Sequence, residues 1–539
     1  MTFNLKLLLA VVFCCAVLQG ALAQKKELKT KFGKISDEEM AMPSYKSDPE
    51  AAAVVLFDKG RVFYTYNDRV GWTQTYERHK RVKIFKKEGY DEANVSFVYN
   101  VNAKIEDVKA VTYNLEGGKI VETKLTNDNI VTETLTKARS SKKMTLPAVK
   151  EGSIIEYKYS IIRVNAASLP DWYFQDQIPT IWSEFEAEVP EVVSYRKVGL
   201  GYTPFLVTES STKIGTANVM YREDSESNLN NNTSVSNLKI TYPMNAMRYV
   251  QANVPALKLE AYTNSVLDYL SCILFEVNAI YNVEYHPQGD VYVMTNTTAR
   301  ASQDTWGDLG KEMYSDVYTD WTAQTDYIDA TALQSIDKSA GEKDKVSSIY
   351  AYFGKNFQTN VNDYVFPSQA LKVCSKTHKG TATDLNLLFI SYLKEAGLTA
   401  YPVMLSTRKH GRVHRFYPNI LAFNRAITAV MIDGKETLID VSNPNLAIGL
   451  LPYEDTNEEG LALKSKTDMT WVALENKVTT RTGTFADLTL GKEGGLNGSL
   501  SISTSGYDAL KQRNTYKEMG ETKAIASFLK ELASDGKIL

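Results

Sequence analysis

The sequence predicts a multidomain chain of the α+β class, in which a β-rich N-terminal domain precedes a smaller domain of mixed helices and strands. The chain has 539 residues, which is more than one hydrophobic core usually holds. Strand-like alternation fills most of residues 51–245, whereas amphipathic helical patterns start only after residue 300 and are followed by short strands. Segregated strands and helices of this kind are typical of α+β architectures.

The composition excludes several classes of protein. Hydrophobic residues make up 43% of the chain and charged residues 23%, which is ordinary for a folded soluble protein. The net charge of -3 is not the strongly positive charge that is typical of nucleic-acid-binding proteins. With 30 Gly and 15 Pro, the chain is neither collagen-like nor of low complexity. We therefore expect a folded protein with no nucleic-acid partner.

Residues 1–23 have the features of a secretory signal peptide. Lys6 supplies the positive charge, residues 7–18 form an apolar run, and Ala21 and Ala23 provide the small residues of a cleavage site. The run is too short to span a membrane comfortably, and no later stretch is long and apolar enough to do so. We expect a secreted or periplasmic protein with no transmembrane segment in the mature chain.

The mature chain is expected to begin with a polar leader and a β-rich domain. Residues 24–50 are rich in Lys and acids, which predicts a leader of limited order. Within residues 51–245, apolar and polar residues alternate at 93–99, and two strand-like runs flank the turn Glu116–Gly117–Gly118 as in a β-hairpin. These patterns predict an antiparallel domain resembling a β-sandwich.

Residues 246–464 carry the helical patterns and form the predicted α+β domain. Helices are expected at 304–317 and 342–356, and a third helix from residue 382 has its apolar residues on one face. That face comprises Leu385, Leu388, Phe389, Tyr392, Leu393 and Ala396. Strands are expected to follow at 400–405, 419–424, 428–432 and 436–440.

The start of the third helix has the features of a functional site. Thr381 or Thr383 can cap it, and Gly397 provides a left-handed stop at its end. The backbone N–H groups and dipole at a helix N-terminus favour an anion and lower the pKa of a cysteine placed there. The position holds Ala382 instead of a cysteine.

This segment resembles the core of the transglutaminase-like superfamily, whose papain-like α+β fold carries a Cys-His-Asp triad. Residues 380–384 fit its Gly-x-Cys-x-Asp turn with Ala382 in the place of the nucleophile. Phe423–Asn424–Arg425 fits its Phe-Asn-His element with Arg425 in the place of the base, and residues 437–442 fit its last strand with Asp440 kept. The resemblance therefore implies a degenerate triad at Ala382, Arg425 and Asp440.

The N-terminal half carries a second resemblance. The turn and strand at 146–159, the aromatic run at 172–175 and the later Asn253–Val254–Pro255 resemble secreted bacterial proteins in which a β-rich domain of unknown function precedes a transglutaminase-like core. In that family a further β-rich domain follows the core. Residues 465–539 supply only a predicted hairpin and two helices, so we expect an incomplete C-terminal domain.

A displaced catalytic site is the alternative that the sequence leaves open. Cys374 could act as a relocated thiol, with His410 or His414 as base and Asp440 as the orienting acid. The spacing differs from that of the superfamily. The histidines are scattered and no Gly-rich phosphate loop is present, so we expect neither a metal nor another cofactor.

The sequence thus predicts a non-catalytic transglutaminase-like protein that binds or scaffolds a peptide or glycan at the cell envelope. The alternative is a thiol-dependent acyltransferase or peptidase that uses the displaced residues. Two cysteines remain after removal of the signal peptide, Cys272 and Cys374, and the sequence leaves open whether they pair. The partner and the oligomeric state are not specified by any pattern.

Overall fold

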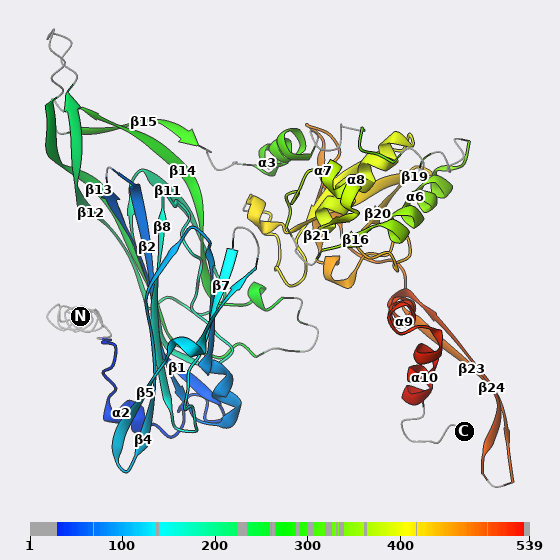
Figure 1. Ribbon diagram of the computed structural model, residues 1–539, viewed down its shortest axis with the longest axis horizontal. Helices are drawn as coiled ribbons and strands as arrows, with labels where there is room; N and C mark the ends of the chain where they lie inside the picture. The colour runs from blue at the N-terminus through cyan, green and yellow to red at the C-terminus, as the bar shows by residue number, and fades with distance from the viewer. Residues whose placement is uncertain are drawn as a thin grey trace, which may run out of the picture. The chain divides into compact units, whose positions relative to one another are not determined.

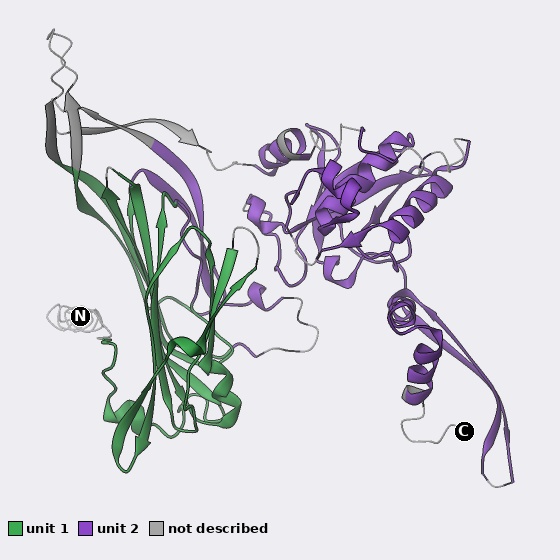
Figure 2. Cartoon of the chain, in the orientation of Figure 1, with its two compact units in different colours: residues 1–166, 174–190, 204–256 green, residues 167–173, 191–203, 257–539 purple. Residues whose placement is uncertain are grey.

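The structure, a computed structural model, divides into two compact units (Figure 2). Unit 1 comprises residues 1–166, 174–190 and 204–256, and unit 2 comprises residues 167–173, 191–203 and 257–539. The predicted signal peptide lies outside the described residues. Described are residues 30–532 except 68, 136–138, 224–233, 259, 261–262, 264, 287–290, 300–304, 319–325, 330–332, 334–338, 361–363, 417 and 493.

A long, twisted eight-stranded sheet forms the body of unit 1 (Figure 1). Its strand order is β12-β13-β10-β1-β2-β8-β4-β5, and every neighbouring pair is antiparallel except the parallel pair of β1 and β10. The predicted hairpin is confirmed as β4 and β5, joined where Gly117 and Gly118 both have positive φ. The strands are β1 (Ala53–Asn67), β2 (Gly71–Ile84), β4 (Lys104–Glu116), β5 (Lys119–Lys124), β8 (Ile154–Val164), β10 (Thr180–Pro190), β12 (Val207–Glu223) and β13 (Ser234–Val254).

A smaller three-stranded sheet covers part of one face of this long sheet. It is formed by β3 (Asn94–Asn100), β6 (Ile130–Thr134) and β7 (Arg139–Thr145) in the order β3-β7-β6. Phe97 of β3 stacks on Tyr159 of β8 with ring centroids 3.9 Å apart, within a buried cluster that also includes residues of β1 and β2. Apolar side chains at every second position of the facing strands make this core.

The buried carboxylate of Glu156 ties the N-terminal segment to the long sheet. It accepts hydrogen bonds from Arg81 Nη2 at 2.7 Å, from the Gly33 amide at 2.9 Å and from the Tyr113 hydroxyl at 3.1 Å, and His79 Nε2 lies 2.8 Å from it. Burial alone would raise the pKa of Glu156, but its hydrogen bonds and the charge of Arg81 lower it below its ordinary value.

Residues 30–50 differ from the leader of limited order that the sequence predicts. They include α2 (Asp37–Ala41), which is capped by Ser36, and they bury Met40 and Tyr45 against the long sheet. Lys83 donates to the Met40 carbonyl and Arg81 pairs with Glu39. The polar groups of this segment form specific ion pairs and hydrogen bonds with the long sheet. Composition alone does not reveal such contacts.

Unit 2 begins with a four-stranded sheet and continues into a helical layer on a five-stranded sheet (Figure 1). The four-stranded sheet contains β9 (Trp172–Tyr173), β11 (Val193–Leu200), β14 (Cys272–His286) and β15 (Val291–Ala299). The five-stranded antiparallel sheet has the order β20-β19-β18-β21-β22, with β18 (Ala400–Leu405), β19 (Arg425–Ile432), β20 (Lys435–Ile439), β21 (Glu459–Leu463) and β22 (Met469–Ala473).

The helices of unit 2 surround one central helix, α8 (Ala382–Glu395). Every residue of α8 from Ala382 to Leu393 is buried, so the helix packs on all sides rather than on the single face that its apolar pattern predicts. Its neighbours include α6 (Glu342–Asn356) and α7 (Leu371–Thr377) together with β18 and β19. Among the described residues, α3 (Trp306–Glu312) and the π-helical turn Met313–Tyr318 precede α6 in the chain. The short strands β16 (Gln358–Thr359) and β17 (Lys379–Gly380) pair in parallel.

The C-terminal segment consists of a two-stranded hairpin and two helices. The hairpin, β23 (Arg481–Leu490) and β24 (Leu496–Ser505), has exposed side chains along nearly its whole length. It is followed by α9 (Gly506–Met519) and α10 (Glu521–Leu532). All four elements agree with the patterns predicted from the sequence.

The predicted multidomain organisation is confirmed, and the chain is mostly β. Strands β21 and β22 are not predicted from the sequence, and one predicted strand is wrong. The sequence predicts a strand at residues 419–424, but Ile420–Ala422 is a 3₁₀ turn whose start is capped by the Asn419 side chain. Asn at that position favours a turn because its side chain bonds the local backbone. The domain boundaries inferred from the sequence near residues 245 and 464 stay predictions.

Replacing Glu156 by Ala is expected to destabilise unit 1 by about 3–5 kcal/mol, because it leaves the buried Arg81 guanidinium without this partner. The matched control is Glu50→Gln, which breaks the exposed ion pair with Lys86 and should leave stability unchanged. Urea unfolding of both variants measures the difference. If both substitutions lowered the free energy of unfolding by the same amount, the contacts of Glu156 would not be a major source of the stability of unit 1.

Candidate functional site

The N-terminus of α8 is fixed by a capping box and a tight glycine. The Thr381 side chain accepts from the Asp384 amide, and the Asp384 carboxylate accepts from the Thr381 amide at 3.0 Å. Asp384 also accepts from the amide of Ser368 at 2.8 Å. A Cβ at Gly380 would lie 2.8 Å from both Cys374 Sγ and Asp384 Cβ, so only glycine fits in front of this helix.

Asn386 links the first turn of α8 to the end of the five-stranded sheet. Its amide nitrogen donates to the Ala382 carbonyl at 2.9 Å and to Asp440 Oδ1 at 2.7 Å. Its amide oxygen accepts from the Val441 amide at 3.3 Å and from the Thr428 hydroxyl at 3.2 Å. Ala382 and Asp440, which the sequence predicts to share a site, are therefore joined through a single side chain.

Arg425 lies beside Asp440, as the sequence predicts. One of its terminal nitrogens is 3.5 Å from Asp440 Oδ2 and 2.5 Å from Asp455 Oδ1. The amide of the next residue, Ala426, donates to the Thr383 hydroxyl at 3.0 Å, which places the start of β19 against the start of α8. The structure thus brings all three predicted site residues to one place.

Asp455 is the member of this cluster that the sequence analysis missed. It belongs to a 3₁₀ turn after Pro452 and is fully buried. Burial first, and then the charge of Asp440, raise the pKa of Asp455 well above its ordinary value, against the opposing effect of Arg425. Asp455 therefore holds a proton more tightly than an exposed aspartate does.

The cluster is closed to solvent rather than lining the shallow cleft expected of a former triad. Exposed fractions are 3% for Ala382, 6% for Arg425, 1% for Asp440 and 0% for Asp455. Because the guanidinium of Arg425 lies between two buried acids, exchanging it for histidine is expected to cost about 3–5 kcal/mol.

Cys374, the displaced thiol of the alternative hypothesis, has the properties of a structural cysteine. It lies on α7 with 0% of its surface exposed. Burial and, to a lesser extent, the nearby Asp384 raise the pKa of its thiol to about 12. A nucleophilic cysteine needs a lowered pKa and access to substrate. Cys272 is likewise a buried free thiol, so the two cysteines do not pair.

His410 and His414 do not form a catalytic contact among the described residues. Nδ1 of His410 lies 2.9 Å from the Ser406 hydroxyl, which itself donates to the Gly411 carbonyl at 2.7 Å. Because the single hydroxyl proton of Ser406 goes to the Gly411 carbonyl, Nδ1–H of His410 donates to Ser406, and this contact involves neither Cys374 nor Asp440. The ring of His414 packs against Phe416.

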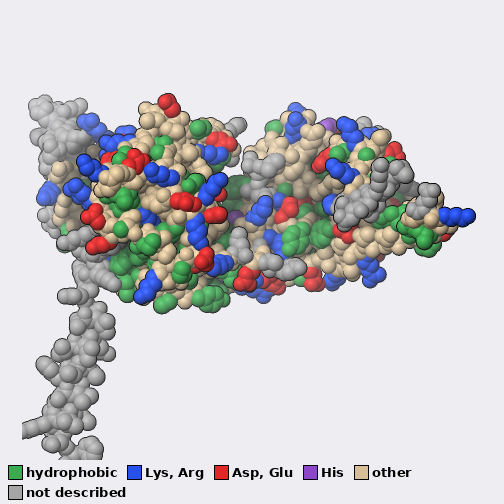
Figure 3. All heavy atoms as spheres, turned by 90° about the horizontal axis from the view of Figure 1, so that it is seen from below, with side chains coloured by type: hydrophobic (Ala, Val, Ile, Leu, Met, Phe, Trp, Pro, Cys, Tyr) green, Lys and Arg blue, Asp and Glu red, His purple; other side chains and the backbone are tan. Residues whose placement is uncertain are grey.

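The part of the chain that the structure describes offers little evidence for a metal site, a membrane-spanning helix or a nucleic-acid-binding surface. No group of three or more His, Cys, Asp or Glu side chains there is arranged to hold a metal ion. No helix in these residues is long and apolar enough to cross a membrane. Figure 3 shows a face on which basic and acidic side chains are interspersed, with no continuous basic area of the kind that follows a phosphate backbone.

Comparison with known families relates the N-terminal half to a domain of unknown function. Residues 72–222, from β2 into β12, match the family described as "Domain of Unknown Function with solved-structure structure (DUF3857)". The match agrees with the β-rich domain of unknown function expected from the sequence. No curated protein matches the chain.

Two solved structures resemble the chain to different degrees. One, described as "a putative protease" from Parabacteroides distasonis, is 13% identical with a TM-score of 0.50, and the alignment covers 79% of this chain and 72% of the other. The likeness concerns the fold alone. Another, "a putative nutrient binding protein" from Legionella pneumophila, is 9% identical with a TM-score of 0.16 over 57% of this chain and 83% of that one, which is too low to carry an argument.

Replacing Asp455 by Asn is expected to make the stability of unit 2 less dependent on pH. With its pKa raised, Asp455 holds a proton more tightly in the folded state than in the unfolded chain. Stability should therefore fall as the pH rises from the ordinary aspartate pKa of about 3.9 towards the folded value. The Asp455→Asn substitution removes the titrating group and with it this fall.

Thermal melts across that pH range, followed by tryptophan fluorescence, measure the effect. Asp487→Asn, at an exposed position on β23, is the matched control and should keep the pH dependence of the native protein. Parallel pH profiles for the native protein and Asp455→Asn would contradict the assignment of a protonated acid to this cluster.

Proposed function

We propose that this protein is a non-catalytic member of the transglutaminase-like superfamily, in which the Cys-His-Asp triad is replaced by Ala382, Arg425 and Asp440. It serves to bind or scaffold a peptide or glycan at the cell envelope. The observation that carries the proposal is the buried ion cluster, in which the guanidinium of Arg425 lies 2.5 Å from Asp455 and 3.5 Å from Asp440.

This cluster lacks the chemistry of a thiol enzyme. Ala382 has no nucleophilic atom at the helix start where a thiolate would be stabilised. A guanidinium keeps its proton at any physiological pH, so Arg425 does not act as a general base. The carboxylate of Asp440 accepts from Asn386 and from the amide and hydroxyl of Ser442, which are contacts of a structural acid.

The proposed location is the periplasm or the exterior of the cell, from the signal-peptide features of residues 1–23. The multidomain arrangement supports a scaffolding role, because a β-rich unit with a large sheet and a second unit with a closed core offer surfaces rather than a reaction centre. A peptide or glycan of the envelope is the class of partner proposed for such surfaces.

The second candidate function is a thiol-dependent peptidase or acyltransferase that uses Cys374. The likeness of the fold to a structure described as "a putative protease" favours it. Against it stand the complete burial of Cys374 and the rise of its thiol pKa to about 12. Fold similarity is a weaker warrant than the chemistry of the site.

Two assays on the full chain test the proposal. One measures incorporation of a fluorescent primary amine into a glutamine-containing protein, and the other measures hydrolysis of fluorogenic peptide amides. The expected result is no turnover above the rate without protein. Alkylation of Cys374 by iodoacetamide at neutral pH should be slow, because the thiolate fraction is small and the sulfur is buried.

The matched pair of variants is Cys374→Ser and Cys272→Ser, since burial also raises the pKa of the Cys272 thiol to about 12. Neither substitution should alter the two assays. Turnover by the native protein that disappears in Cys374→Ser and survives in Cys272→Ser would overturn the non-catalytic proposal.

A further inference from the structure

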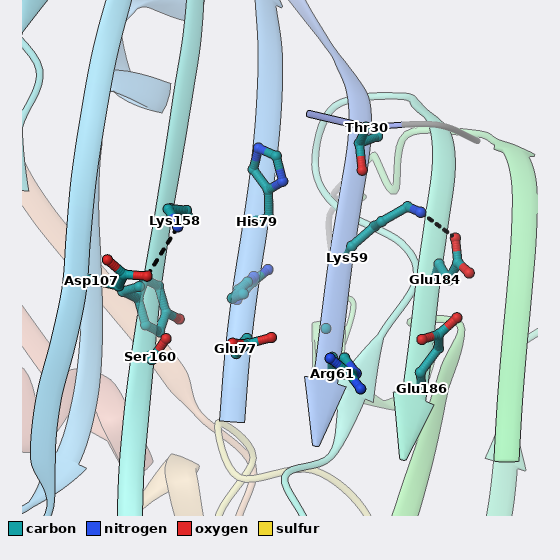
Figure 4. A pocket seen from close by; sticks show the side chains of 13 residues that line it. Thr30, Lys59, Arg61, Glu77, His79, Asp107, Lys158, Ser160, Glu184 and Glu186 are labelled. Atoms are coloured by element: carbon teal, nitrogen blue, oxygen red, sulfur yellow. Dashed lines mark hydrogen bonds and ion pairs between the residues drawn. The ribbon is translucent and has the colours of Figure 1, made fainter. Parts of the chain in front are cut away.

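A pocket of about 380 Å³ lies on the face of the long sheet of unit 1 opposite the three-stranded sheet (Figure 4). Strands β10, β1, β2 and β8 form its floor, and charged side chains of both signs point into it. Tyr159, which also borders the pocket, has its ring on the other face, stacked on Phe97. The lining on this face is thus mainly charged, with the imidazole of His79, which lies 2.8 Å from Glu156, as its aromatic ring.

The charges in one row of the pocket neutralise one another. Lys59 on β1 lies 3.0 Å from Glu184 on β10, and Lys158 on β8 lies 3.1 Å from Asp107 on β4, as the dashed lines in Figure 4 mark. Glu184 accepts further hydrogen bonds from the side chains of Arg248 and Trp182. Because each of these charges already has a partner of opposite sign, they are not available to bind a charged ligand.

Arg61 and Glu77 in the next row are opposite charges that do not pair. They are directly opposite in the register of β1 and β2, where a cation and an anion ordinarily form an ion pair. The guanidinium of Arg61 instead lies over the Phe63 ring at 4.9 Å and reaches only to 4.0 Å from Glu188.

The side chain of Glu77 makes neither a hydrogen bond nor an ion pair within the described part of the chain. The Arg61 side chain is 49% exposed. The backbones of Glu77 and Arg61 thus lie one strand spacing apart, about 4.8 Å, with a partly exposed carboxylate on one strand and an accessible guanidinium on the other. Ser160, opposite Glu77 in the register of β2 and β8, adds a hydroxyl at the edge of this pair.

Glu186 does not replace Glu77 as the anion of the pocket. It lies beside Arg61 on the other side, 3.4 Å from Arg248. Burial, and then the neighbouring Glu184, raise the pKa of Glu186 above its ordinary value, and Arg248 already supplies its carboxyl group with a cation. Glu77 is therefore the carboxylate best placed to receive a cation.

We propose that this pocket binds a free amino acid or a short peptide, with the ligand ammonium at Glu77 and the ligand carboxylate at Arg61. A zwitterion carries the two charges in the arrangement complementary to this pair, and a guanidinium binds a carboxylate through two parallel hydrogen bonds. The volume of the pocket suits a ligand of the size of a dipeptide.

The inference does not rest on the proposed loss of catalysis in unit 2. It concerns a different unit, and all residues that carry it belong to unit 1. The turnover assays do not involve the pocket, so each proposal can be supported or contradicted independently of the other.

Isothermal titration calorimetry of the full chain with three probes tests the proposal. The probes are alanyl-alanine, N-acetyl-alanyl-alanine, which lacks the ammonium, and alanyl-alanine amide, which lacks the carboxylate. The variants are Glu77→Gln and Arg61→Gln. Glu122→Gln and Lys119→Gln, which remove exposed charges from β5 of the same sheet, are the matched controls.

Alanyl-alanine should bind, and Glu77→Gln and Arg61→Gln should each weaken its binding by about 10-fold to 100-fold, the usual size of one charge-assisted hydrogen bond. Acetylation of the probe should cause a similar loss with the native protein and little further loss with Glu77→Gln, because the same contact is already missing. Amidation of the probe should likewise weaken binding to the native protein and cause little further loss with Arg61→Gln. The control variants should bind as the native protein does.

Two results would overturn the proposal. One is that the native protein binds none of the three probes at their highest soluble concentrations. The other is that alanyl-alanine binds equally well to the native protein, Glu77→Gln and Arg61→Gln, which would place the ligand elsewhere. Circular dichroism of each variant checks that a loss of binding does not come from a loss of folding.

Discussion

The arrangement of unit 2 depends on the hydrogen bonds that Asn386 makes inside a fully buried helix. A helix buried on every side must satisfy each of its polar groups without water, since an unpaired buried group costs about 1–3 kcal/mol. Asn386 does this by bonding Asp440 and the Val441 amide at the end of β20 and Thr428 in β19. The same bonds fix the helix start relative to the sheet.

Under the proposed function, this constraint explains why the core persists without catalysis. The packing of α8 requires Asp440 as a partner for Asn386, whether or not that acid orients a base. Arg425 and Asp455 then complete a closed cluster with Asp440. Under the proposed function, the acid of the former triad is retained for the structure of the core, while the groups that react are gone.

Much of the fold could be predicted from local patterns. The apolar periodicity placed α6 at residues 342–356 and α8 at residues 382–395, and alternation placed β18, β23 and β24. Local chemistry also limited the cap to Thr381 or Thr383, of which the structure shows Thr381, and located the stop at Gly397, which has a positive φ. These features depend on residues close in sequence, so a single chain is enough to reveal them.

The features that escaped prediction depend on contacts between distant residues. Asp455 lies in a polar run after Pro452, and nothing in that run shows that the fold buries it beside Arg425. The pocket on the long sheet was missed because Arg61 and Glu77 look like an ordinary solvated face until the register places them opposite each other. The order of residues 30–50 likewise comes from Glu156, more than a hundred positions away.

The pKa of a cysteine introduced at position 382 tests the central claim most directly. In a chain that also carries Cys272→Ser and Cys374→Ser, the thiol of Ala382→Cys can be titrated by its ultraviolet thiolate absorbance, with Ala396→Cys at the opposite end of α8 as the matched control. Burial at position 382, which is 3% exposed, raises a thiol pKa, so the value must be compared with that of the equally buried Cys374 in a chain that keeps this cysteine, about 12. If position 382 is that of a lost nucleophile, the helix N-terminus should hold its thiol pKa below that of Cys374 and below that of the control at position 396. A thiol pKa at position 382 equal to or above that of Cys374 would contradict the account.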